Sequence, residues 1–546
     1  MCIEHDIAIL RVPEVEMEEH TAVLIVGAGY AGLSAATMLA WHQVPVILVE
    51  RHASTSIQPK AFGVGPRVLE LMRGVPGIES EFSEIWAGIG EGMRIAIASS
   101  LTDPDPKILV DTAAGDLDTF VDITPVRDVG APQSEIERVL RGKAEEFGAD
   151  LRFSTELVSL EQDADGVTAR VKTKDGEHTI RADYLIAADG HRSPLRTALG
   201  VPTSGKGELQ HMHSIMFDAD LSQVVRDREV TLWYLQADGL TGAIITGTGV
   251  GAHGLGVYYD PATDPGFTTE RCISLVRQAV GLPGLDVSIL DTTTFTIAHK
   301  LADTYRAGRV FFAGDAAHTM PPTGGQGGST ALQDGCDLAW RLWLVHSGQA
   351  GPAFLDTYDA ERRPIGALTA TEQLANMAVR MPAEQTRDVA PPTADPMAVI
   401  LGYRYHSTSI LNEPADDGSL LENPLTATAR PGSRAPHVLL DWEGMPISTI
   451  DLFGTGHVLL IGPRGRDWET AARAVSDRLD LHLTPLVIGG DLKDMEGVWQ
   501  ERYGVTETGA VLVRPDGYVS WRAPALTPSP KDTLNDVLTT TLSRHP

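Results

Sequence analysis

The sequence has little cysteine, no long apolar run and no basic leader. Its 546 residues include only Cys2, Cys272 and Cys336, which are far apart and form no C-x-x-C pair, so neither a disulfide framework nor a metal site is expected. No run of 18 apolar residues is present, which argues against a membrane-spanning helix. The first twenty residues are acidic, unlike a signal peptide. These absences together predict a cytoplasmic protein.

Basic residues are also scarce relative to acidic ones. The chain carries 44 Lys and Arg against 73 Asp and Glu, a formal net charge of -29. Such a surface repels phosphate backbones and anionic lipid, so we expect neither nucleic acid nor a membrane among its partners. The apolar fraction of 42% is that of an ordinary globular protein. The length exceeds what one hydrophobic core serves, which predicts more than one structural unit.

A buried strand, a glycine-rich turn and a helix are predicted near the N-terminus. Residues 22–26 form a continuous apolar run, followed at once by Gly27, Gly29 and Gly32. Glycines at this spacing permit a tight turn and a close approach of the backbone to a pyrophosphate, while the helix start offers free N–H groups. The next apolar strand ends at Glu50, where an acidic side chain can bind ribose hydroxyls. The pattern predicts a dinucleotide-binding βαβ unit.

Two further nucleotide-like loops follow apolar strands later in the chain. An Asp-Gly pair beginning at Asp189 follows one strand, and a Gly-Asp pair ending at Asp315 follows another. The Asp-Gly pair alone is also typical of an ordinary tight turn. A glycine-rich loop over 324–328 then opens a helix predicted over about 329–345. A dehydrogenase needs only the first of these loops, so the combination indicates a different class.

In combination, the loops resemble the class A FAD-dependent aromatic hydroxylases, and in particular the polyketide and anthracycline (aklavinone-type) hydroxylases of actinobacteria. Further matching segments lie at 401–405, 430–437, 451–454 and 509–517. The resemblance implies an α/β fold in which a glutathione-reductase-type FAD-binding domain is interleaved with an antiparallel-sheet substrate domain, followed by a thioredoxin-like domain. The implied boundaries are 20–95, 125–205 and 300–380 for FAD; 96–124 and 206–299 for substrate; 381–430 for a linker and connecting segment; and 431–546 for the C-terminal domain.

The resemblance also assigns residues to the FAD site. Lys60 stands where the family usually has Arg, and Ser329 stands where it usually has Asn. For the substrate, the resemblance singles out Arg380 and Tyr234, with an ordinary core or surface role as the alternative for each. The residues assigned to FAD are Gly27, Gly29, Gly32, Glu50, Arg51, Lys60, Gln133, Val158, Asp189, Asp315, Gly325, Gln326, Gly327, Gly328 and Ser329.

The implied activity is hydroxylation of a phenolic or polyketide aromatic ring. In this family, non-covalent FAD is reduced by NADPH or NADH and reacts with O2, and a flavin C4a-hydroperoxide delivers one oxygen atom to the ring, so no protein nucleophile is expected. The expected partners are a small aromatic substrate and O2, with a homo-oligomer left open. Two alternatives also stay open: a Baeyer–Villiger or epoxidising enzyme on the same scaffold, and a non-catalytic flavin- or drug-binding resistance protein. No cysteine follows Cys336, so the C-terminal domain has no dithiol chemistry and is expected to serve packing, assembly or stability.

Overall fold

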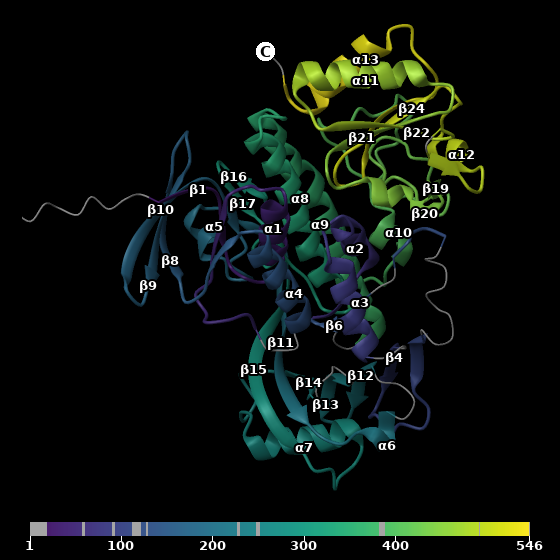
Figure 1. The fold of residues 1–546 in the computed structure, drawn as a ribbon. Helices are drawn as coiled ribbons and strands as arrows, with labels where there is room; N and C mark the ends of the chain where they lie inside the picture. Colours follow the sequence, from purple (N-terminus) through teal and green to yellow (C-terminus); the bar gives the residue numbers. More distant parts are fainter. Residues whose placement is uncertain are drawn as a thin grey trace, which may run out of the picture.

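The computed structural model contains two large β-sheets, the helices that cover them and a smaller C-terminal unit (Figure 1). Within the part of the chain that it describes, no helix is long and apolar enough to cross a membrane. The structure describes residues 19–56, 61–89, 93–111, 122–126, 129–225, 230–246, 252–381, 388–490 and 492–544.

The first sheet is built around the strand predicted from the N-terminal apolar run. Its strands, in sheet order, are β16 (Arg306–Ala307), β17 (Val310–Phe312), β10 (Gly176–Ala187), β1 (Glu19–Val26), β2 (Val46–Val49) and β7 (Asp150–Arg152), with β9 (Val167–Thr173) and β8 (Glu156–Gln162) extending from β10. β1 pairs in parallel with β2 and with β10. Residues 22–26 are buried, as expected for a central parallel strand whose two faces are both covered.

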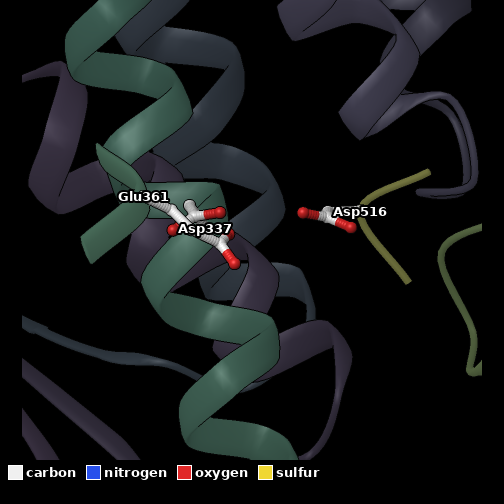
Figure 2. A group of neighbouring side chains, drawn as sticks. All are labelled: Asp337, Glu361 and Asp516. Carbon is white, nitrogen blue, oxygen red and sulfur yellow. The ribbon is translucent and has the colours of Figure 1, made fainter. Parts of the chain in front are cut away.

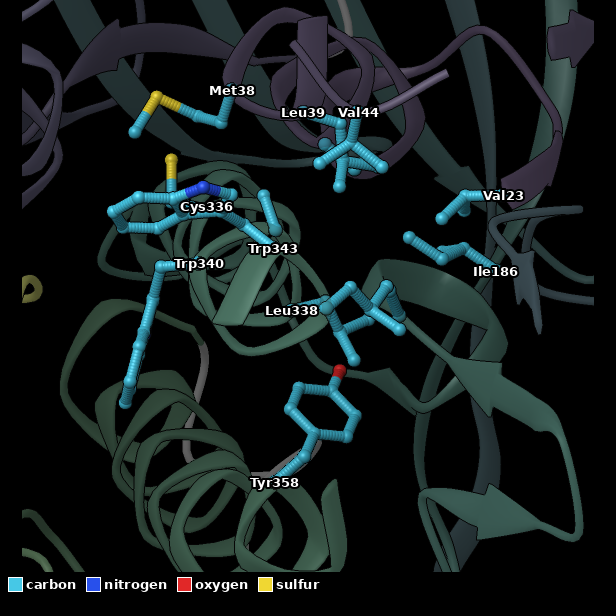
Figure 3. Close-up of a cluster of buried hydrophobic side chains, with 14 of the residues drawn as sticks. Val23, Met38, Leu39, Val44, Ile186, Cys336, Leu338, Trp340, Trp343 and Tyr358 are labelled. Carbon is cyan, nitrogen blue, oxygen red and sulfur yellow. The ribbon is translucent and has the colours of Figure 1, made fainter. Parts of the chain in front are cut away.

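Four helices pack on this sheet and form its core: α1 (Tyr30–Trp41), α4 (Gln133–Glu146), α8 (Gln326–His346) and α9 (Asp356–Arg380). Figure 3 shows Val23 and Ile186 of the sheet facing Leu338 of α8 and Tyr358 of α9. α1 and α8 lie close together because Gly335 has no side chain, and a Cβ there would overlap Ser34 Oγ. The helix predicted over about 329–345 is therefore confirmed as α8, which begins three residues earlier.

The second sheet is mainly antiparallel and lies below the first in Figure 1. Its strands, in order, are β18 (His318–Thr319), β15 (Ser288–Ala302), β11 (Thr203–Asp218), β14 (Ala252–Tyr259), β13 (Leu240–Thr246), β12 (Val230–Ala237), β4 (Met93–Ala98) and β5 (Lys107–Asp111). The amphipathic helix α7 (Thr269–Val280) buries Cys272 and Val276 against the sheet in a separate core.

The C-terminal unit holds a four-stranded mixed sheet. In order, its strands are β22 (Leu483–Val487), β21 (His457–Ile461), β24 (Ala510–Val513) and β25 (Val519–Ala523). β21 and β22 are parallel, whereas β21, β24 and β25 are successively antiparallel. Alongside it are the helices α11 (Arg466–Leu479), α12 (Trp499–Tyr503) and α13 (Pro530–Thr541) and a three-stranded sheet of β20 (Met445–Ser448), β19 (Leu439–Trp442) and β23 (Leu492–Asp494).

Short elements connect these units. They are β3 (Phe62–Val64), α2 (Pro66–Met72), α3 (Ile78–Ile89), β6 (Val129–Pro132), α5 (Pro194–Ala198), α6 (Ser222–Val225), α10 (Pro396–Leu401) and 3-10 helices at Gly314–Ala316, Pro352–Leu355 and Thr449–Leu452. The chain after α10 is well packed, because Tyr403 and Tyr405 are buried in one cluster with Ile365 and Tyr518. This cluster joins α9 to the C-terminal unit.

Candidate functional site

One cavity of about 1830 Å³ extends from the loops of the first sheet to one face of the second sheet. Its wall includes most of the residues singled out in the sequence. Gly27 and Gly32 are not in the wall and lie behind it, whereas Lys60 lies outside the described residues. The predicted residues that line the cavity are Gly29, Glu50, Arg51, Gln133, Val158, Asp189, Tyr234, Asp315, Gly325, Gln326, Gly327, Gly328, Ser329 and Arg380.

The first glycine turn has its shape because side chains are excluded from it. Gly27 has φ of 108°, a left-handed value that favours glycine, and a Cβ there would overlap Ala188 O. A Cβ on Gly32 would overlap Gly27 O, whereas one on Gly29 would meet no described atom within 4 Å. Gly29 immediately precedes α1 and faces the cavity, so it leaves backbone N–H groups exposed to a ligand. This cradle fits a pyrophosphate.

Glu50 lies at the end of β2, beside the glycine turn. Its Oε2 accepts a hydrogen bond from Ala28 N at 2.9 Å, and its Oε1 accepts one from His52 N at 2.9 Å. The side chain is 14% exposed and lines the cavity. The carboxylate therefore holds the backbone at Ala28 and at His52 in place, and its remaining lone pairs can accept a hydrogen bond from a ligand hydroxyl.

Asp189 organises the second loop. Its Oδ1 accepts from Ser193 Oγ at 2.7 Å and its Oδ2 from Leu195 N at 3.0 Å, at the start of α5. Burial raises the pKa of Asp189, although these hydrogen bonds oppose the shift. Arg196 Nη1 donates to Ala316 O at 2.6 Å, so this loop is tied directly to the Gly-Asp turn.

The Gly-Asp turn and the start of α8 form the third part of the wall. Asp315 is exposed toward the cavity, while Gly314 and Ala316 on either side are buried. α8 begins after Gly325, which has φ of 71° and no side chain to cap the helix. Ser329 Oγ accepts from Gly65 N at 3.1 Å. The serine at the usual Asn position thus binds a neighbouring backbone loop.

A buried carboxylate that the sequence analysis missed holds this region together. Asp334 of α8 accepts from Gly314 N at 3.0 Å, from His318 Nε2 at 2.7 Å and from Arg362 Nε at 2.9 Å. Burial opposes its ionisation, but the charge of Arg362 lowers the pKa of Asp334 below its usual value. The sequence gives little signal for this role, because Gln333 and Asp337 are also polar residues in the middle of the same helix.

The far end of the cavity reaches one face of the second sheet. It is bounded by Tyr234 of β12 and Tyr258 of β14, both mostly buried, and by Ala243 and Ile245 of β13, the strand that lies between them. The Arg380 guanidinium lies 5.7 Å from the Tyr234 ring centroid. Its Nη1 is buried and has no hydrogen-bond partner among the described residues. Burial raises the pKa of Tyr234, and the charge of Arg380 opposes that shift.

Two residues of the C-terminal unit, His437 and Leu439, also line the cavity. His437 Nδ1 lies 2.6 Å from Ser448 Oγ, and burial lowers the pKa of His437. Nothing in the sequence analysis indicated that this unit reaches the cavity, because every matched cofactor motif precedes it.

A buried acidic cluster lies outside the cavity. Asp337, Glu361 and Asp516 have carboxylate oxygens within 4.8 Å of one another (Figure 2). Arg341 pairs with Asp337 and Glu361, and Arg514 pairs with Glu361 and Asp516. Because these arginines compensate the carboxylates, the cluster is an ion-pair network between α8, α9 and the C-terminal unit.

The glycine turn, the two acidic loops and the uncapped helix around one cavity define a flavoprotein of the FAD-binding monooxygenase fold. Comparison with known proteins gives the family. Residues 20–373 match the FAD binding domain family, and residues 428–544 match the C-terminal domain of the aromatic-ring hydroxylases. The chain therefore belongs to the FAD-dependent aromatic-ring hydroxylases.

Relatives match over nearly the whole chain. The 4-methyl-5-nitrocatechol 5-monooxygenase of a Burkholderia species is 39% identical, over 97% of this chain and 98% of its own. The aklavinone 12-hydroxylase of Streptomyces purpurascens is also 39% identical, over 97% of this chain and 100% of its own. The crystal structure of aklavinone-11 hydroxylase with FAD and aklavinone superimposes with a TM-score of 0.92 at 39% identity, covering 97% of this chain and 100% of that one.

Proposed function

We propose that this hydroxylase inserts oxygen into a flat, phenol-bearing polycyclic ring of the aromatic polyketide type. The observation that carries the proposal is the continuity of the cavity: the dinucleotide loops and the Arg380–Tyr234 end share one space. Two relatives named as aklavinone 12-hydroxylase and tetracenomycin A2 monooxygenase-dioxygenase support a polyketide substrate.

In this proposal, different loops of the cavity wall bind different parts of FAD. The turn at Gly27, Gly29 and Gly32 takes the pyrophosphate, Glu50 takes the ribose, and the loop at 325–329 takes the flavin ring. Arg51, Gln133, Val158, Asp189 and Asp315 complete the contacts, and Lys60 remains a proposal from sequence alone. FAD held here and reduced by NADPH or NADH would activate O2, of which one oxygen atom would enter the ring and the other would leave as water.

The protein's own contribution is to position and to stabilise charge. Arg380 faces the substrate end with a buried N–H that has no hydrogen-bond partner among the described residues, which suits a phenolate oxygen. By favouring the ionised form, Arg380 keeps the ring as a phenolate, whose ortho and para carbons are more electron-rich than those of the neutral phenol. The uncapped start of α8 offers backbone N–H groups to negative charge on the reduced ring.

We also propose the division into an FAD-binding domain, a substrate domain and a thioredoxin-like C-terminal domain at the boundaries predicted from the sequence. The mixed sheet β22-β21-β24-β25, with helices alongside it, supports the last assignment. This unit has no cysteine, so its part in the enzyme is structural and not redox.

The test is FAD reconstitution followed by NAD(P)H oxidation with and without aromatic polyketides and simple phenols. The proposal expects a yellow protein and oxidation that accelerates with a phenol. A protein that takes up no FAD would overturn the cofactor assignment. Lactone formation from a ketone, with no response to phenols, would favour Baeyer–Villiger chemistry. Tight binding of the ring compound without O2 consumption would favour a non-catalytic binding protein.

A further inference from the structure

Helix α2 is joined to the C-terminal unit by buried charges. Arg434 Nε donates to Glu70 Oε2 at 2.7 Å, and its Nη2 contacts Glu70 Oε1, so the guanidinium holds both carboxylate oxygens. Arg67 Nη1 donates to Glu70 Oε2 at 3.1 Å and its Nη2 to Asp516 O. The side chains of Glu70, Arg67 and Arg434 are 0%, 4% and 4% exposed. Two residues of the C-terminal unit thus clamp one short helix.

The clamped helix continues directly from a wall of the cofactor cavity. α2 begins at Pro66, and residues 61–66 all line the cavity. Gly65 N donates to Ser329 Oγ in the first turn of α8. A shift of α2 would therefore move the loop at 61–66 and loosen its bond to the helix that faces the flavin.

Arg434 is also close in sequence to the C-terminal unit's own contribution to the cavity. His437 and Leu439 follow it by three and five residues and line the same space. Thr124 Oγ1 donates to Glu70 Oε1 at 2.6 Å, next to Pro125 and Val126 of the cavity wall. Glu70 thus connects three segments on one side of the cofactor site: α2, the segment at Thr124 and the segment at Arg434.

We propose that Arg434 is a positioning residue of the FAD site, which makes the C-terminal unit a working part of that site and not only a packing domain. It acts through Glu70 and α2 on the loop at 61–66, and the inference rests on the FAD placement proposed above. Buried ion pairs contribute little net stability but leave a costly uncompensated charge when one partner is removed, so their loss displaces the elements they join.

The test measures the FAD dissociation constant of the full-length apoprotein by flavin fluorescence, without turnover. Arg434→Gln is expected to weaken FAD binding about tenfold or more, and the Arg434→Gln/Glu70→Gln double variant to bind more tightly than the product of the single effects predicts. Arg522→Gln is the matched control, because Arg522 pairs with Glu413 and neither residue lines the cavity. The Arg522→Gln variant should keep FAD affinity within about twofold of the wild type, even if its melting temperature falls as much as that of Arg434→Gln.

A folded Arg434→Gln protein with wild-type FAD affinity would overturn the inference, as would strictly multiplicative single effects or equal weakening by Arg522→Gln. If Arg434→Gln does not fold, Arg434→Lys decides: lysine keeps the charge but lacks the planar fork. Weakened FAD binding in that variant supports the inference, and unchanged binding refutes it. Failure of the wild-type protein to bind FAD would instead refute the proposed function.

Discussion

The two ends of the cavity are built by different means. At the dinucleotide end the backbone sets the shape, because Cβ atoms on Gly27 or Gly32 would overlap carbonyl oxygens. At the ring end side chains of separate elements set the shape: Tyr234 and Tyr258 come from the second sheet and Arg380 from the end of α9. The glycine positions of the dinucleotide end therefore tolerate few substitutions, whereas a few substitutions can change the shape of the ring end. Relatives whose names specify a nitrocatechol and aklavinone are each 39% identical to this chain.

The largest expected effect tests the rigid end. Gly32→Ala should destabilise the apoprotein by more than about 3 kcal/mol and abolish flavin uptake, because the new Cβ overlaps Gly27 O. Gly29→Ala is the matched control, since its Cβ meets no described atom within 4 Å. That variant should melt like the wild type without FAD yet bind FAD more weakly. Thermal unfolding and flavin titration check both, and equal apoprotein stability for all three proteins would contradict the argument.

The ring end should respond through turnover and not through cofactor binding. Arg380→Met should lower kcat/KM for a phenol about 100-fold, because the phenolate loses a buried cationic partner. Its FAD affinity and melting temperature should stay near those of the wild type. Steady-state kinetics with a phenolic substrate check this. A variant with full activity would assign Arg380 an ordinary structural role.

A smaller effect is expected from Glu50, which both holds two backbone segments and is placed to bind the ribose. Glu50→Gln keeps the shape of the side chain but removes the charge that accepts from Ala28 N and His52 N. A hydrogen bond to a charged group contributes about 1.5–3 kcal/mol, so FAD affinity should fall about 10- to 100-fold. Isothermal titration measures it directly. Wild-type affinity would mean that Glu50 does not bind the ribose.

The glycine turn and the acidic loops could be predicted from sequence because their chemistry depends on local backbone geometry. Gly27, Glu50, Asp189 and Asp315 each follow one of the mutually parallel strands of the first sheet, and such strand ends meet at one edge. Contacts between distant segments could not be predicted. Arg434 and Glu70 are 364 residues apart, and no local pattern indicates that they meet.

The assignment of Arg380 and Tyr234 as possible substrate contacts depended on resemblance and not on spacing. The structure brings the two side chains together at the cavity end, while their contact with substrate stays a prediction. Ser329 stands where the family usually has Asn. The serine hydroxyl instead accepts a hydrogen bond from Gly65 N, which depends on a loop far away in the chain.

The smallest effect concerns a histidine remote from both ends. Burial lowers the pKa of His457 to about 4, below the ordinary value of about 6.5. Between these two pH values only the unfolded chain takes up a proton at His457. The free energy of unfolding is therefore not reduced by this group above about pH 6.5, and it falls as the pH drops toward 4. From about pH 7 to about pH 5.5, this group should account for about 1 kcal/mol. His457→Gln should reduce the pH dependence of unfolding by that amount in denaturant titrations, and an unchanged slope would contradict the assignment.

In the proposed mechanism, one cavity joins FAD chemistry to a phenolate held at Arg380. The most direct measurement is mass spectrometry of the product formed from a phenolic aromatic polyketide under labelled dioxygen, with NAD(P)H and the FAD-loaded protein. We expect one labelled oxygen atom in the wild-type product and little product from the methyl ether, which cannot form a phenolate. Oxygen that comes from water, or equal hydroxylation of the phenol and its methyl ether, would contradict it.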